Sequence, residues 1–183
     1  GIRAGDAAGV AMPSTAAGRL LTVAGAFVRT RSFRDVAVLV RHPDFETALR
    51  LAKPELEPLD TLDEYHASHL PWRADGDWSA DSSKERDVAL RRRMDALWSV
   101  ARDLLGELLD AQSAPIAAQA GALRRFLERI YAARDLDRNS DADRVLIASL
   151  QCLAHGVSEL EGLPEQLASA GSIADSIDML LGL

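Results

Sequence analysis

Several kinds of residue are scarce in this sequence. It contains a single cysteine, Cys152, so no disulfide can form within the chain, and we expect a protein of a reducing compartment, the cytoplasm. No run of residues approaches the roughly 20 apolar positions of a membrane-spanning helix, so we expect no membrane contact. The net charge of −7 argues against a surface that coats nucleic acid indiscriminately, although a local basic groove is still allowed.

Lysine is also scarce, which excludes two catalytic motifs. Asp44 follows a proline, as at the start of a PD-(D/E)xK nuclease site, but that site needs an acidic residue two positions before a lysine. The two lysines, Lys53 and Lys84, are instead preceded by Leu51 and Ser82. The sequence contains no GxxxxGK[ST] phosphate loop either. We therefore expect no catalytic activity in this chain alone and no cofactor.

One stretch looks different from the rest of the chain. Residues 36–40 are β-branched or apolar at consecutive positions, which predicts a strand over about 35–41 that is buried on both faces. Helical patterns flank it at 15–30 and 45–52, as in half of a doubly wound α/β unit. No equally good partner strand occurs elsewhere, which suggests either weak strands that the pattern does not reveal or a piece of a larger α/β protein.

The remainder has helical periodicity. Apolar positions recur every three or four residues over 83–108, 115–135 and 141–161, and two shorter helices are expected after Pro164 and Ser172. The predicted fold class is therefore mostly α: a small α/β part around one buried strand, residues 1–81, followed by an antiparallel helical bundle, residues 82–183. We expect the two parts to pack as one unit.

Two groups of side chains are candidate sites. His66 and His69 are three residues apart on one predicted helix, but there is no HExxH motif and no cysteine pair, so polar contacts at the helix end are favoured over metal binding. The second group consists of arginines on two predicted helices that could contact phosphates: Arg86, Arg91, Arg92, Arg93, Arg124 and Arg125. Interleaved acidic residues favour a solvated face with i to i+4 pairs as the simpler interpretation.

The order of elements resembles an internal segment of a known family. The residues that carry the resemblance are RDVAVLVRHPD at 34–44, LDEYHASHLP at 62–71, and the long helices that follow. They resemble the helicase-like part of AddB-type subunits, the nuclease-bearing partners in bacterial complexes that repair double-strand breaks. The resemblance implies a part that has lost ATP hydrolysis and helps to guide DNA, with the nuclease in a separate region.

Two functions remain open. The first is a non-catalytic domain of a helicase–nuclease-like protein of DNA repair, whose partners are DNA, neighbouring domains or another subunit. The alternative is a helical protein–protein interaction module with no role in binding nucleic acid.

Overall fold

The computed structural model describes residues 9–74, 76, 84–163 and 171–182, and it is mostly helical. Eight α-helices and three short 3-10 helices are present in these ranges, and the described residues contain no strand beyond one isolated bridge between Ser32 and Arg73. The α-helices are α1 (Ala16–Thr30), α2 (Phe33–Val40), α3 (Pro43–Ala52), α4 (Pro58–His69), α5 (Glu85–Leu105), α6 (Ile116–Tyr131), α7 (Asp141–Glu161) and α8 (Ile173–Leu181). The 3-10 helices are η1 (Met12–Ser14), η2 (Gly106–Leu108) and η3 (Ala111–Ser113).

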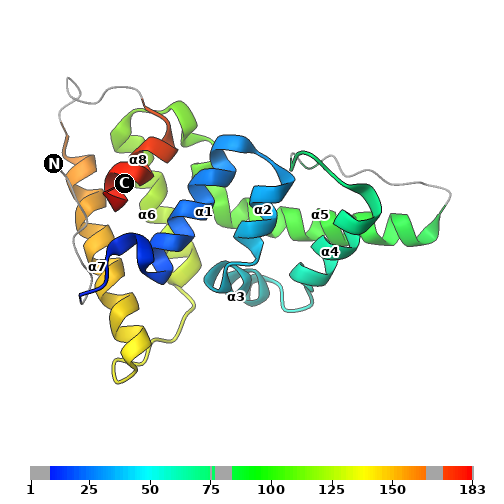
Figure 1. Cartoon of the computed structure of the whole chain (residues 1–183), viewed down its shortest axis with the longest axis horizontal. Helices are drawn as coiled ribbons and strands as arrows, with labels where there is room; N and C mark the ends of the chain where they lie inside the picture. Colours follow the sequence, from blue (N-terminus) through cyan, green and yellow to red (C-terminus); the bar gives the residue numbers. More distant parts are fainter. Residues whose placement is uncertain (1–8, 75, 77–83, 164–170, 183) are drawn as a thin grey trace.

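Helix α1 occupies the middle of the molecule (Figure 1). It begins at an N-cap, because the hydroxyl of Thr15 accepts a hydrogen bond from the backbone N–H of Gly18 at 3.0 Å. Its apolar residues, among them Leu20, Ala24 and Phe27, are fully buried. It packs against α2 on one side and against α7 and α8 on the other, so it joins the first and last parts of the chain.

The strand expected at 35–41 is wrong, because these residues form helix α2. Ser32 caps this helix by accepting a hydrogen bond from the N–H of Asp35 at 3.0 Å, a local signal that favours a helix over a strand. Val36 and Val40, one turn apart, are buried against Leu97 of α5 around a small apolar cavity. Val38, which a doubly covered strand would bury, is 47% exposed.

The predicted small α/β part is therefore helical too. In Figure 1, α2 and α4 cross in front of the long helix α5 and α3 lies below it; α3 and α4 pack directly on α5. The mostly helical class is confirmed, whereas the α/β character of residues 1–81 is not supported. Residues buried in both halves of the chain, from Met12 to Leu181, belong to one contiguous hydrophobic cluster.

The later helices follow the sequence pattern closely. Helix α7 begins after Ser140, which caps it, and ends before Gly162. Helix α8 has a full capping box between Ser172 and Asp175. The short helix predicted after Pro164 lies outside the described residues. In the described part of the chain, none of the helices combines the length and the apolar character that crossing a membrane would need.

Candidate functional site

Three of the four arginines of α5 that could contact phosphate are paired with carboxylates. Arg86 donates from Nε and Nη2 to Glu64 of α4 at 3.1 and 2.8 Å, and Arg93 donates to the second oxygen of the same carboxylate. Hydrogen bonds from Arg93 and then Arg86 lower the pKa of Glu64. Arg91 lies 4.0 Å from Asp95, so only Arg92 of these four lacks an ion pair within the described ranges.

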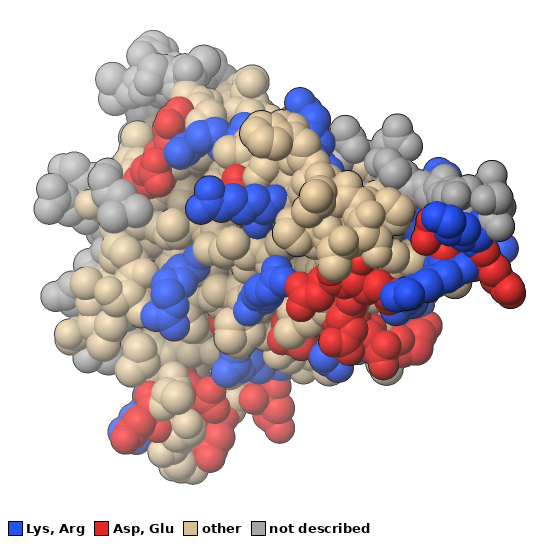
Figure 2. Space-filling model, turned by 45° about the vertical axis from the view of Figure 1, so that its right-hand side comes forward, with Lys and Arg blue, Asp and Glu red and all other residues tan. Residues whose placement is uncertain are grey.

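The two arginines of α6 are also paired, but with other elements. Arg124 forms an ion pair with Glu161 of α7, and Arg125 forms one with Glu107 of η2. The two predicted groups of arginines are therefore anchored to different neighbours. Acidic and basic atoms also lie side by side at the right-hand side of Figure 2, so this surface is mixed in charge.

The two histidines of α4 make ring contacts. His66 stacks on Phe33 with ring centres 5.8 Å apart, and the ring of His69 lies 4.7 Å from that of Tyr65. Over the residues that the structure places, no group of three or more histidine, cysteine or acidic side chains is arranged to hold a metal ion. These are contacts between rings, whereas polar contacts at the helix end were the favoured interpretation.

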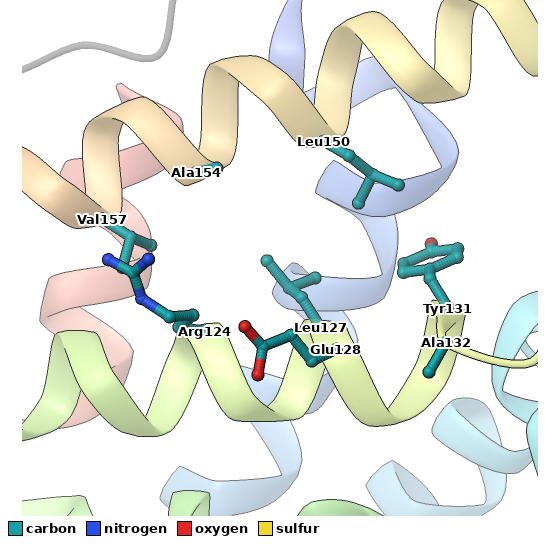
Figure 3. Close-up of a pocket in the computed structure, with 8 residues that line it drawn as sticks. All are labelled: Arg124, Leu127, Glu128, Tyr131, Ala132, Leu150, Ala154 and Val157. Carbon is teal, nitrogen blue, oxygen red and sulfur yellow. The ribbon is translucent and has the colours of Figure 1, made fainter.

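An apolar groove between α6 and α7 is a site that the sequence reasoning missed. It has a volume of about 350 Å³. Figure 3 shows its lining: Arg124, Leu127, Glu128, Tyr131 and Ala132 from α6, with Leu150, Ala154 and Val157 from α7. The three residues from α7 recur at positions 150, 154 and 157, which is one face of a helix. The sequence shows that face, but not that α6 leaves part of it uncovered.

Charge around the groove is uneven. Arg124 on its edge is neutralised by Glu161. The phenol of Tyr131 at one end donates to Asp44 at 2.7 Å, and burial, followed by the contact with Asp44, raises its pKa, so the ring is uncharged. Glu128 is exposed and has no side-chain partner among the residues described. The groove is therefore apolar inside and has one uncompensated negative charge on its edge.

No family model, curated protein or solved structure matches this chain. Function is therefore inferred from the groove and from the charges around it.

Proposed function

We propose that this chain is a non-catalytic helical contact module that binds a basic amphipathic helix of another protein or domain in the α6/α7 groove. The observation that carries this proposal is the open apolar trough between two packed helices. Leu150 and Ala154 of α7 point into this trough (Figure 3), where Leu150 is half-buried and Ala154 is exposed. Amphipathic helices bind such grooves by inserting apolar side chains spaced at i, i+3 or i+4, and i+7.

The size and charge of the groove support this occupant. A volume of about 350 Å³ lies at the lower end of the roughly 300–1,000 Å³ range of binding pockets, which suits a few apolar side chains. Glu128 stands on its edge with no cation partner among the residues that the structure places, and the chain carries a net charge of −7. A partner with lysine or arginine beside its apolar stripe would therefore be complementary, and would associate faster at low salt.

The proposed setting is the one that the family resemblance implies. In an AddB-type subunit of a repair complex, the docked helix would come from a neighbouring domain or a partner subunit. Contact with DNA through the arginines of α5 and α6 stays a prediction. Five of those six side chains already pair with a carboxylate, so binding phosphate would require exchange of these partners.

The groove can be tested with a substitution that fills it. Ala154 lines the groove on α7 and is exposed, so Ala154→Arg should fold normally while blocking it and repelling a basic peptide. Ala142 is exposed near the start of the same helix, outside the groove, so Ala142→Arg is a matched control. We would titrate labelled synthetic helices with one leucine stripe, flanked by either lysine or glutamate, and measure fluorescence anisotropy.

We expect the lysine-flanked peptide to bind best, and Ala154→Arg to weaken its binding at least about tenfold, or about 1.4 kcal/mol. Ala142→Arg should bind as the native chain does. Equal affinity of the native chain and Ala154→Arg would contradict the groove. A labelled oligonucleotide that binds the native chain, but not a variant with Arg91, Arg92 and Arg93 changed to serine, would favour the DNA-contact function instead.

A further inference from the structure

A separate groove, the α1/α2 groove, lies where α1 meets the end of α2 and the start of α3, which are neighbours in Figure 1. It has a volume of about 610 Å³, within the roughly 300–1,000 Å³ range of sites for small molecules. Most of its lining is apolar and comes from Pro13, Val23, Val38 and Pro43. Val38 is exposed, so apolar surface faces solvent here.

The charge in this groove comes from one side chain. The described residues that line it include two arginines and a histidine but no acidic residue. Arg41 is already neutralised by an ion pair with Asp63. Burial lowers the pKa of His42 below its ordinary value, although Asp44 raises it, and the charge of Arg19 lowers it further. His42 is therefore uncharged at neutral pH, and Arg19 supplies the positive charge of the groove.

Arg19 is available to a ligand. It is exposed and forms no ion pair with the described residues. Its Nη1 donates to the carbonyl of Ser14, and a guanidinium has five N–H groups, so donors remain. Val23 follows Arg19 by four residues on α1, which is about 6 Å along the helix. The cation therefore stands about one turn from an apolar surface.

We propose that the α1/α2 groove binds a fatty acid, with its carboxylate at Arg19 and its hydrocarbon chain along Val23 and Val38. An arginine binds a carboxylate with charge-assisted hydrogen bonds, and each methylene that leaves water adds to the affinity. One unpaired cation matches one carboxylate. A phosphate monoester would bring a dianion to a chain whose net charge is −7, and an acidic helix would bring several carboxylates to a single arginine.

The test uses the whole chain and dodecanoate, titrated by isothermal calorimetry at pH 7 below the critical micelle concentration of the acid. Arg19→Gln removes the charge but keeps a polar side chain of similar reach. Arg34 is also exposed, makes no ion pair with the residues that the structure places and is not part of the groove lining, so Arg34→Gln is the matched control.

A second pair of variants tests the apolar part of the groove. Val38→Asp places a negative charge where the hydrocarbon chain would lie, and because Val38 is exposed the variant should fold, which circular dichroism checks. Leu51 of α3 is exposed to a similar extent, at 51% against 47% for Val38, and does not line the groove. Leu51→Asp is therefore the matched control.

We expect dodecanoate to bind the native chain and both controls alike. Arg19→Gln should bind it at least about threefold more weakly, because an exposed ion pair makes a modest contribution. Val38→Asp should bind it at least about tenfold more weakly, because the new carboxylate repels the ligand and apolar contact is lost. Dodecylamine, which has the same chain and the opposite charge, should bind the native chain more weakly than dodecanoate does.

Equal affinity of the native chain and both groove variants, or of dodecanoate and dodecylamine, would overturn the proposal. A glutamate-flanked leucine helix that binds the native chain but not Arg19→Gln, while dodecanoate does not bind at all, would show that the groove takes a protein segment instead. The α1/α2 groove shares no lining residue with the α6/α7 groove, so failure of this test leaves the proposed helix-binding function standing.

Discussion

Asp44 shows how a single buried charge fixes the position of a helix. It lies in the first turn of α3, is 8% exposed, and accepts hydrogen bonds from the phenol of Tyr131 and from Arg134. Arg134 also lies 3.5 Å from Asp143 in the first turn of α7. A buried carboxylate is tolerated only when its oxygens are satisfied, so this network fixes how α3, α6 and α7 meet.

Tyr131→Phe should therefore destabilise the fold by about 1.5–3 kcal/mol near neutral pH, because a hydrogen bond to a buried charge is lost. Burial and then Asp44 raise the pKa of Tyr131 above its ordinary value of 10.0, so the folded state holds this proton more tightly than the unfolded chain. The stabilisation is fully present below about pH 10 and is lost as pH rises further. Urea unfolding at pH 7 and from pH 9 to 11 measures both effects.

The difference in the free energy of unfolding between the native chain and Tyr131→Phe should shrink above pH 10. If the two proteins lose stability in parallel over that range, Tyr131 does not titrate as the network requires.

Helix α2 illustrates an element whose stability comes from packing. Its eight residues include three valines, which have a low helix propensity, and a helix this short is marginal alone. The cap at Ser32 and the contacts of Val36 and Val40 with α4 and α5 stabilise it. Val38 is on the opposite face, toward solvent.

Adjacent positions in α2 should therefore respond differently to the same charge. Val38→Asp should change the free energy of unfolding by less than about 1 kcal/mol, because the side chain is 47% exposed. Leu39→Asp should cost several kcal/mol, because Leu39 is fully buried and the charge would have no partner. Thermal unfolding of both variants is the measurement. A strongly destabilised Val38→Asp would indicate that both faces of this stretch are covered.

At the scale of the whole molecule, α1 links the chain's two ends. The N-terminal part, residues 1–81, was predicted to precede a separate bundle at 82–183, packed as one unit. Helix α1 forms much of the surface that α8 covers. Gly25 of α1 lies so close to Ile177 of α8 that an added Cβ would come within 3.1 Å of the Ile177 side chain. Ile173, Ile177 and Leu180 of α8 are almost fully buried. Without α1, the side of α8 that includes Ile177 would be exposed to water.

We therefore expect one cooperative unfolding transition, seen together by far-UV circular dichroism and by tryptophan fluorescence. The fragment 84–183 should not fold alone, because removal of α1 exposes the apolar side of α8. Circular dichroism of this fragment checks the second part. A fragment with native-like helicity and its own sharp transition would instead support two independent domains.

The sequence alone determined the helical class and several helix ends. Caps at Thr15 and Ser172, the stop at Gly162 and the apolar period of 141–161 are signals between residues a few positions apart, so they act before tertiary contacts form. The scarcity of lysine likewise excluded a PD-(D/E)xK site within the chain. The stretch 35–41 was misassigned because a short apolar run has the same composition in a strand and in a packed helix.

Tertiary structure alone decided which faces of the helices are covered. The α6/α7 groove exists because α6 leaves Leu150 and Ala154 partly uncovered, and periodicity does not show where a neighbouring helix stops. Arg31 and Arg102 are 71 positions apart in the sequence, and they line one cavity only because the end of α1 lies beside the end of α5. The α6/α7 groove and this pocket both depend on contacts between residues distant in the chain, which local sequence patterns do not determine.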